Sequence, residues 1–258
     1  MGFKKTAEEL KNYYNIKTRD FKDAEMLGVM FNTTPEKIKE LLPAPLEPTP
    51  SSSGLIFVAQ YKDTNLGKGY REAALFLKCQ YKGEEGTYCL SMPITDETRM
   101  VNGRDVFGYP KKMATIHLEK SGNEAQAWVE RNGVRLLEVK ARFSSQLPAL
   151  PPTGPNFLFK AMPKIDLTPG FDGPVFLARQ ETTINLKKLE LGMAQVKLKS
   201  SDSDSWAEVE IANPDTLMAF YMISDNSMLP GKILTEVDAE SFIPHYFKMT
   251  DFFTNKNT

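Results

Sequence analysis

Short runs of alternating or β-rich residues recur along most of this 258-residue chain. Because successive side chains of a strand point to opposite faces, such runs predict half-buried β-strands. The segment 82–86 (KGEEG) separates two of the runs, and the Asn132-Gly133 pair, which readily adopts the positive φ of tight hairpins, separates two others. These are too many short strands for an α/β protein, so we expect a mainly β fold. The runs are residues 26–31, 55–61, 73–81, 88–94, 113–118, 125–129, 134–143, 157–162, 175–178, 182–186, 195–198 and 206–211.

Three helices are expected beside the strands. The first has Thr33 or Thr34 as its N-cap, a proline in its first turn, and ends at Pro43. The second opens after residues 213–215 and carries Leu217, Met218 and Tyr221. The third spans residues 97–108, because Pro110 would end any helix before it. The residues after Pro110 therefore lie at a helix-to-strand junction, which can hold a side chain rigidly.

The length and composition fit one domain covering residues 1–258, with the first 20 or so residues peripheral. Hydrophobic residues make up 41% of the chain and charged residues 25%, enough apolar material for a core. The proline-rich stretch 148–155 is interpreted as a crossover within that domain, and the serine-rich segments 51–53 and 200–205 as exposed loops.

Charge and special residues narrow the function classes. The 32 Lys and Arg nearly balance the 33 Asp and Glu, which gives no electrostatic case for binding nucleic acid or an anionic membrane. No signal-like segment and no apolar run of about 20 residues occurs, so we expect a cytoplasmic protein. Two histidines are too few for a metal site, and we expect no cofactor. Cys79 and Cys89 could form a hairpin disulfide, although buried free thiols are favoured.

Two adjacent lysines, Lys111 and Lys112, are the strongest candidates for chemistry. Two neighbouring ammonium groups repel each other, and an apolar surrounding adds a desolvation penalty that favours the neutral form of one amine. A neutral amine can condense with a ketone to an iminium, which accepts the electrons of a breaking C–C bond. The alternative interpretation is a pair of solvated surface charges, which is the usual state of a Lys-Lys pair.

The residues around this pair resemble a known family. Gly103-Arg104-Asp105 followed by Tyr109-Pro110-Lys111-Lys112 is similar to the Gly-Arg-Glu-x-x-x-Tyr-Pro-Lys-Lys motif of acetoacetate decarboxylases, the established example of a lysine activated by an adjacent cation. Three further segments resemble family motifs in the same order: 42–47 (LPAPLE), 63–72 (Asp-Thr followed by Gly-Tyr-Arg-Glu) and 155–157 (Pro-Asn-Phe). The likeness covers about residues 21–163 and fades beyond them.

The resemblance implies a closed, cone-like antiparallel β-barrel with a few peripheral helices. It implies that Lys111 forms the imine, that Lys112 is its neighbouring cation and that Glu72 is an active-site acid. It also places Phe21, Met92 and Tyr109 in the lining of the substrate pocket. An ionised carboxylate touching the amine would favour its charged form, so we expect Glu72 to be offset from Lys111 or kept neutral by burial.

Two departures from the family pattern affect the substrate. Phe57 stands where the family has a second active-site glutamate, and Ala24 where it has an arginine near the substrate. If that arginine holds the substrate carboxylate, either another cation replaces it here, with Arg104, Arg99 and Arg71 as candidates, or the substrate differs. An apolar residue in place of glutamate favours a larger or less polar substrate.

The resulting hypothesis is a lyase that decarboxylates acetoacetate or a related β-keto acid through a Schiff base on Lys111. Two alternatives stay open: an aldolase-dehydratase acting on pyruvate-like keto acids through the same lysine, and a non-catalytic β-barrel that binds a small apolar ligand. The resemblance also implies a homo-oligomer. The C-terminal aromatic residues are assigned to the core rather than to a subunit contact; they are Phe242, Tyr246, Phe247, Phe252 and Phe253.

Overall fold

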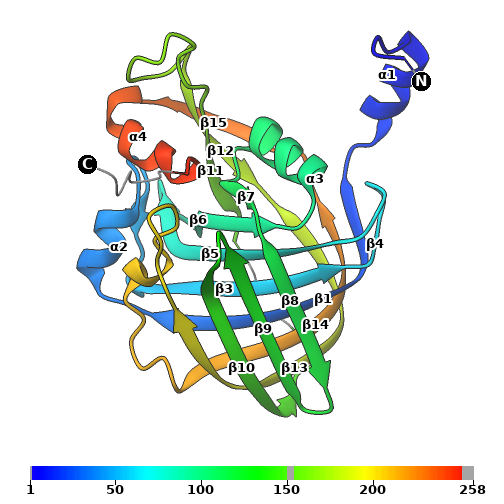
Figure 1. Cartoon of the computed structure of the whole chain (residues 1–258), viewed down its shortest axis with the longest axis vertical. Helices are drawn as coiled ribbons and strands as arrows, with labels where there is room; N and C mark the ends of the chain where they lie inside the picture. The colour runs from blue at the N-terminus through cyan, green and yellow to red at the C-terminus, as the bar shows by residue number, and fades with distance from the viewer. Residues whose placement is uncertain (1, 150–153, 252–258) are drawn as a thin grey trace.

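A single fifteen-stranded sheet dominates the molecule, with the helices at its periphery (Figure 1). The computed structural model describes residues 2–149 and 154–251. The expectation of a mainly β fold with a few peripheral helices is confirmed.

The strands follow one another in hairpins over much of the chain. The strands before the lysine pair are β1 (Arg19–Asn32), β2 (Glu47–Pro48), β3 (Ser53–Tyr61), β4 (Asp63–Thr64), β5 (Tyr70–Tyr81) and β6 (Glu84–Ile94). From the lysine pair onward they are β7 (Lys111–Met113), β8 (Thr115–Ser121), β9 (Glu124–Arg131), β10 (Val134–Gln146), β11 (Asn156–Lys160), β12 (Val175–Gln180), β13 (Thr182–Leu198), β14 (Leu217–Met228) and β15 (Lys232–Val237). The helices are α1 (Ala7–Asn15), α2 (Pro35–Leu41), α3 (Glu97–Asn102), the π-helix η1 (Gly103–Phe107), the 3-10 helix η2 (Trp206–Val209), α4 (Ala239–Tyr246) and the 3-10 helix η3 (Phe247–Met249).

The sheet curls into a cone-like shape (Figure 1) without closing through hydrogen bonds. The strand order is β15-β12-β11-β6-β5-β3-β1-β14-β13-β10-β9-β8, and the short strands β2, β4 and β7 pair beside this path. Within the described residues, β15 and β8 are the two ends of the path, so closure of the barrel is not confirmed. The end strand β8 instead packs against β3 and β5. Two pairings, β6 with β7 and β6 with β11, are parallel, whereas the resemblance implied an antiparallel barrel.

Most of the predicted elements are present. The turn expected within residues 82–86 is Lys82-Gly83, which joins β5 to β6, and Asn132-Gly133 joins β9 to β10; Lys82 and Asn132 both have positive φ. The helix after Thr34 is α2, whose N-cap hydroxyl accepts a hydrogen bond from the Lys37 N–H. The third predicted helix is the continuous pair α3 and η1, which ends before Pro110 as expected.

Two of the expected elements are wrong, and a third is interrupted. The helix expected after residues 213–215 is strand β14, in which Leu217, Ala219 and Tyr221 are buried while Met218 is exposed. Pairing with both β1 and β13 overrides the local helical spacing. The strand expected at 206–211 begins as the helical turn η2, and the one expected at 113–118 is interrupted between β7 and β8. Helices α1 and α4 were not predicted.

Both faces of the central strands are buried, and this divides the core in two. Along β5, Ala73, Leu75 and Leu77 enter the larger cluster, while Ala74 and Phe76 enter a second one on the other face. We call the second one the site cluster; its members are Phe21, Ala24, Phe57, Ala59, Tyr61, Tyr70, Ala74, Phe76, Cys89, Met92, Ile94, Tyr109 and Leu158.

The two cysteines are free and buried, as favoured from the sequence. They cannot meet across the β5–β6 hairpin, because Cys79 lies opposite Gly86 and Cys89 lies opposite Phe76. Cys79 belongs to the larger cluster and Cys89 to the site cluster. Burial raises the pKa of each thiol to about 12.

Both ends of the described chain lie outside the sheet. Helix α1 has no buried residue and stands away from the body (Figure 1). Phe242 and Tyr246 of α4 are buried and Phe247 is half-buried, in agreement with a core role, whereas Phe252 and Phe253 lie outside the described residues. So do Pro151 and Pro152 of the proline-rich stretch. No helix in the described ranges is long and apolar enough to span a membrane.

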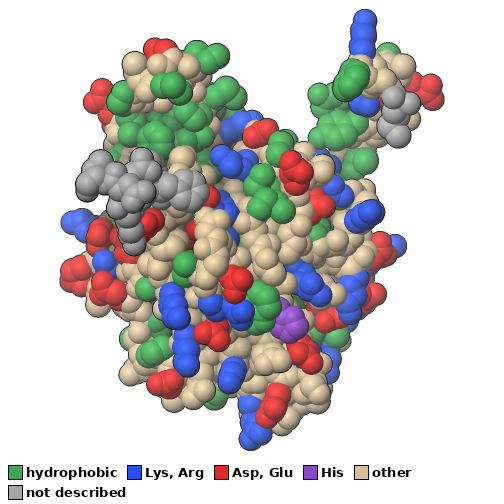
Figure 2. All heavy atoms as spheres, in the orientation of Figure 1, with side chains coloured by type: hydrophobic (Ala, Val, Ile, Leu, Met, Phe, Trp, Pro, Cys, Tyr) green, Lys and Arg blue, Asp and Glu red, His purple; other side chains and the backbone are tan. Residues whose placement is uncertain are grey.

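Hydrophobic side chains gather on two projections at one end of the molecule (Figure 2). One is α1, and the other is the loop between β11 and β12. Their exposed apolar residues are Leu10, Tyr13 and Tyr14 on α1 with Ile16 at its C-cap, and Met162, Ile165 and Leu167 on the loop.

Candidate active site

Lys111 is the first residue of strand β7, at the helix-to-strand junction that the sequence predicted. Parallel pairing of β7 with β6 places Lys111 opposite Met92. The preceding helix ends at Gly108, whose φ of 84° is in the left-handed region. A Cβ at Gly108 would lie 2.3 Å from the carbonyl oxygen of Phe159, so the turn requires glycine for two reasons.

The Lys111 side chain is buried and its Nζ directly contacts Oε2 of Glu72. Both side chains are 8% exposed, so the amine and the carboxyl group face each other in an environment with little water. Of the two alternatives expected for Glu72, an offset from the amine is therefore wrong, and a carboxyl group kept neutral by burial stays a prediction. Strand pairing brings the two side chains together. Glu72 of β5 pairs with Ile94 of β6, and β6 pairs in turn with β7, which begins at Lys111.

The predicted lining residues share the site cluster. Phe21, Phe57, Met92 and Tyr109 are all buried in it, and the Lys111 Nζ lies 5.7 Å from the centroid of the Tyr109 ring. Other rings of this cluster were not predicted. Tyr61 packs 4.5 Å from Phe21, and Tyr70 lies 5.1 Å from Tyr61, measured between ring centroids.

Ala24 and Phe57 also belong to the site cluster, so both substituted positions face the site. Neither side chain offers a polar group. Phe57 packs against Phe76 with 5.7 Å between the ring centroids, which makes this part of the site aromatic.

The Tyr109 hydroxyl is held by two amides, those of the buried Gln180 and the half-buried Asn156. It donates to Oε1 of Gln180 at 2.8 Å and accepts from Nδ2 of Asn156 at 2.9 Å. Burial is the main reason that the pKa of Tyr109 is raised well above its usual range, so the hydroxyl stays neutral. Asn156 lies in the Pro-Asn-Phe segment that resembles a family motif, whereas no pattern in the sequence indicated Gln180.

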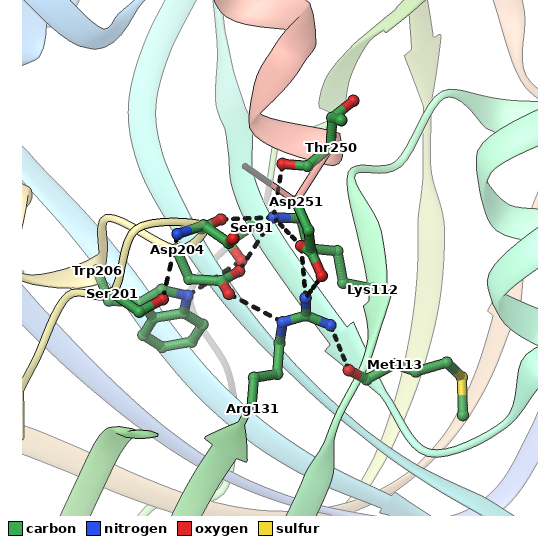
Figure 3. A network of polar contacts seen from close by, with 10 residues as sticks. Ser91, Lys112, Met113, Arg131, Ser201, Asp204, Trp206, Thr250 and Asp251 are labelled. Atoms are coloured by element: carbon green, nitrogen blue, oxygen red, sulfur yellow. Dashed lines mark hydrogen bonds and ion pairs between the residues drawn. The ribbon is translucent and has the colours of Figure 1, made fainter. Parts of the chain in front are cut away.

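Lys112 points away from Lys111, because successive residues of a strand face opposite sides. Its Nζ lies 3.2 Å from Asp204 and 3.1 Å from Asp251, and it donates to the carbonyl oxygens of Ser203 and Thr250. Figure 3 shows Lys112 and Arg131 converging on the same two carboxylates, with Arg131 at 2.9 Å from Asp204 and 2.6 Å from Asp251.

This network changes the role implied for Lys112. Two carboxylates neutralise two cations, so the ammonium of Lys112 is compensated on the far side of β7 and is not a free charge beside Lys111. It also corrects the interpretation of 200–205 as an exposed loop, since Asp204 is buried. The network ties the loop before η2 and the residues after η3 to the strand that carries Lys111.

Arg104, predicted to bind substrate, is directed elsewhere. Its side chain hydrogen-bonds Tyr246 of α4, which packs in the larger cluster and not in the site cluster. The structure thus brings Lys111 and Glu72 together with Phe21, Met92 and Tyr109, and it leaves Arg104 and the ammonium of Lys112 outside. Among the residues that the structure describes, no group of three or more His, Cys, Asp or Glu side chains could hold a metal ion.

The chain is similar in sequence to acetoacetate decarboxylases. The family model described as acetoacetate decarboxylase (ADC) matches residues 5–237. Acetoacetate decarboxylase 2 of Mesorhizobium japonicum is 24% identical over 226 residues, covering 86% of this chain and 85% of the relative. Acetoacetate decarboxylase of Burkholderia cenocepacia is 29% identical over 155 residues, covering 57% of this chain and 62% of the relative.

Solved structures with the same fold include three of related description. Acetoacetate decarboxylase from Legionella pneumophila has a TM-score of 0.76 at 20% identity, covering 85% of this chain and 88% of its own. The enduracididine biosynthesis enzyme MppR complexed with pyruvate has a TM-score of 0.72 at 17% identity, with coverages of 85% and 91%. An acetoacetate decarboxylase-like enzyme from Sphingomonas wittichii has a TM-score of 0.74 at 18% identity, with coverages of 85% and 93%. Since the family model spans most of the sequence, the chain belongs to the acetoacetate decarboxylase family.

Proposed function

We propose that this protein is a Schiff-base-forming carbon–carbon lyase that decarboxylates acetoacetate or a related β-keto acid, with Lys111 as the nucleophile. The observation that carries the proposal is the buried contact between Lys111 and Glu72 beside the aromatic site cluster. A lysine and a carboxylate enclosed together are costly to bury, and active sites are where such pairs concentrate.

The chemistry follows from an amine with a proton acceptor in contact. Glu72 takes the proton of Lys111, and the freed amine attacks the ketone carbon; loss of water then gives an iminium. The bond from the α-carbon to the carboxylate breaks, its electron pair moves to the iminium nitrogen, and CO2 leaves. Protonation of the enamine carbon, with Glu72 as the proton donor, and hydrolysis return the ketone and the free Lys111.

The aromatic character of the site bears on the substrate. Phe57 and Ala24 remove two polar groups from positions that the family uses, and Phe57 adds a ring that packs on Phe76. We therefore expect turnover of β-keto acids with an alkyl group larger than the methyl of acetoacetate.

One observation favours a second candidate reaction. A structural neighbour, MppR, is described in complex with pyruvate and with a condensation product of pyruvate and an aldehyde. Aldol condensation and dehydration on pyruvate would use the same lysine imine. Parallel assays of CO2 release from β-keto acids and of enone formation from pyruvate plus an aldehyde distinguish the two reactions.

The nucleophile is tested by borohydride reduction in the presence of a ketone. We expect peptide mass mapping to find the reduced adduct on Lys111 and Lys111→Ala to lose both the adduct and turnover. The matched control is Lys160→Ala, which removes an exposed lysine from β11 and should keep both. Full turnover by Lys111→Ala would refute the proposal, and absence of any adduct would favour a non-catalytic ligand-binding role.

A further inference from the structure

A keto acid brings a carboxylate into the site, and a carboxylate shielded from water needs a cationic partner. Lys111 is committed to the ketone carbon in the proposed reaction, and Ala24 offers no charge. The sequence left three arginines as candidates for this partner, namely Arg71, Arg99 and Arg104. Their side chains lie in three different surroundings.

Two of the three are directed away from the site. Arg71 precedes Glu72 in β5, so its side chain leaves the opposite face of the strand, where its Nε donates to Gln60 at 3.2 Å. Arg104 hydrogen-bonds Tyr246 of α4. Neither guanidinium faces the site cluster.

Arg99 of α3 lies at the edge of the site cluster. Its side chain is 13% exposed, and its Nη2 donates to the carbonyl oxygen of Leu66, a residue that packs on the cluster. Gly67 leaves room for this guanidinium, because a Cβ there would lie 3.1 Å from Nη2. The next residue of the helix, Met100, also packs on the cluster.

The guanidinium of Arg99 has unused hydrogen-bonding capacity. Its buried Nε has no hydrogen-bond partner among the described residues. Its nearest carboxylate is that of Asp96, whose Oδ1 is 3.8 Å from Nη1 and accepts instead from the Arg99 backbone N–H. Buried N–H groups in folded proteins are almost always paired, so a free one at the edge of the site cluster is available to an acceptor atom of a ligand.

Tyr70 connects Arg99 electrostatically to the catalytic pair. Burial is the main reason that the pKa of the Tyr70 hydroxyl is raised well above its usual range. The nearby Glu72 raises this pKa further, and Arg99 lowers it. Arg99 and Glu72 are therefore both close enough to the same hydroxyl to act on it.

The register of β3 with β5 fixes the order of residues along the site. Phe57 lies opposite Ala74, Ala59 opposite Glu72, and Tyr61 opposite Tyr70. Glu72 is thus flanked along the strands by the Phe57 ring on one side and by the two tyrosines, with Arg99 beyond, on the other. A substrate on Lys111 has a cationic end and an aromatic end available to it.

We propose that Arg99 binds the substrate carboxylate and that the alkyl group on the ketone carbon extends toward Phe57. This inference rests on the proposed function and specifies its substrate class as β-keto acids with an alkyl group larger than methyl. An arginine fork suits a carboxylate, with Nε–H as its free donor. Because this contact is made before and during the reaction, it supports binding more than the chemical step.

The test compares Arg99→Gln with Arg71→Met. Arg71 is the matched control because its side chain lies on the face of β5 opposite that of Glu72. Gln keeps an amide donor for the Leu66 carbonyl but removes the charge. With 3-oxohexanoate as substrate we expect Arg99→Gln to raise KM at least about tenfold with a smaller change in kcat, and Arg71→Met to stay within about twofold of wild type. The KM of Arg99→Lys for 3-oxohexanoate should fall between those of the other two variants.

Borohydride trapping with a neutral ketone separates this inference from the proposed function. Trapping of 2-pentanone on Lys111 should be the same in wild type and Arg99→Gln, because that ketone has no carboxylate. Failure of wild type to trap the ketone would defeat the proposed function itself. Normal trapping together with an unchanged KM for 3-oxohexanoate in Arg99→Gln would defeat only the role of Arg99.

A measurement on the wild type alone covers the case in which the Arg99 variants do not fold. Butanoate and 1-butanol have similar alkyl chains, and only butanoate carries a carboxylate. We expect butanoate to inhibit the trapping of 2-pentanone at a concentration at least about tenfold lower than 1-butanol. Equal inhibition by the two would overturn the proposal.

Discussion

Gly103 and Lys111 show what the glycine of the Gly-Arg-Asp motif does. A Cβ at Gly103 would lie 2.5 Å from Cε and 2.6 Å from Cδ of Lys111. The backbone at Gly103 is helical, with φ of −65° and ψ of −39°, so its conformation does not require glycine. The missing side chain is therefore what allows the lysine to lie against the helix.

Gly103→Ala should separate activity from stability. Alanine suits a helical backbone better than glycine by up to about 1 kcal/mol, so we expect thermal stability to be maintained. The Lys111 side chain must move, and a shift of about 1 Å in a reacting group can lower a rate about 100-fold. The rate of borohydride trapping measures this, with Gly122→Ala, in an open turn, as control. Wild-type trapping by Gly103→Ala would show that the lysine tolerates the added methyl group.

The site residues were predictable from the sequence to different extents. Lys111, Glu72 and Tyr109 lie in motifs that follow in order along the chain, Phe21 and Met92 follow from the family resemblance alone, and the structure places all five together. The partners of the Lys112 ammonium could not be predicted in the same way. They are the carboxylates of Asp204 and Asp251, which are distant in sequence and gave no local signal.

At the scale of elements, the junction of η1 with β7 fixes the start of the strand that carries Lys111. The N–H of Gly108 donates to the carbonyl oxygen of Arg104 at 3.0 Å and that of Tyr109 to Gly103 at 3.1 Å. The sequence predicted the end of the helix, since Pro110 cannot continue it. It did not predict that the turn packs on the backbone of β11, which lies far along the chain.

Gly108→Ala and Gly83→Ala form a matched pair at this scale. Their φ values are nearly equal, 84° and 82°, but a Cβ at Gly83 meets nothing within 4 Å, whereas at Gly108 it meets the Phe159 carbonyl oxygen. Both should lose about 1–2 kcal/mol through the left-handed backbone. Gly108→Ala should lose roughly 1–3 kcal/mol more through overpacking, measured by urea unfolding. Equal losses would mean that the turn adjusts without cost.

The wrong assignments also belong to the scale of elements. Strand β14 was predicted as a helix because Leu217, Met218 and Tyr221 have helical spacing, although Leu217, Ala219 and Tyr221 also fit alternation. Only its position between β1 and β13 decides the conformation. Short apolar segments commonly show this ambiguity, since periodicity alone does not distinguish a buried strand from a helix.

At the scale of the whole molecule, the C-terminal segment α4–η3 lies beyond residue 237, where the family match ends, and packs against the site strands. Lys248 of η3 donates to the Tyr88 hydroxyl and, at 3.0 Å, to the Cys89 carbonyl oxygen of β6. Thr250 and Asp251 contact Lys112 of β7. This segment therefore supports both strands of the β6–β7 pair from outside the site cluster.

Lys248 should make stability depend on pH. Burial lowers the pKa of Lys248 to about 7, while an unfolded chain keeps that proton to about pH 10.4. Between these values the unfolded state binds more protons, so the free energy of unfolding rises with pH, by up to about 1.4 kcal/mol per unit. Below about pH 7 this effect is constant.

Urea unfolding of Lys248→Met from pH 7 to 10 isolates this effect. We expect the variant to lack the rise seen in wild type, whatever fixed offset the lost hydrogen bonds produce. Lys160→Met, at an exposed position, should keep the wild-type slope. Identical slopes in Lys248→Met and wild type would mean that Lys248 stays protonated in the folded protein.

Assembly and location stay predictions at this scale. We expect a cytoplasmic homo-oligomer, and the exposed apolar residues of α1 and of the loop between β11 and β12 are consistent with a subunit contact. Light scattering coupled to size-exclusion chromatography checks the assembly.

The sequence alone determined the strand-rich fold, the helix before the lysines and the choice of Lys111 as the candidate nucleophile, because alternation, proline and ordered motifs act locally along the chain. The tertiary structure decided where each charged side chain lies and which groups it contacts. Pairing of distant strands placed Glu72 on Lys111, turned Lys112 toward Asp204 and left Arg99 at the edge of the site. Those contacts depend on strand register and on which face each residue occupies, and these are set by the whole sheet rather than by any one segment.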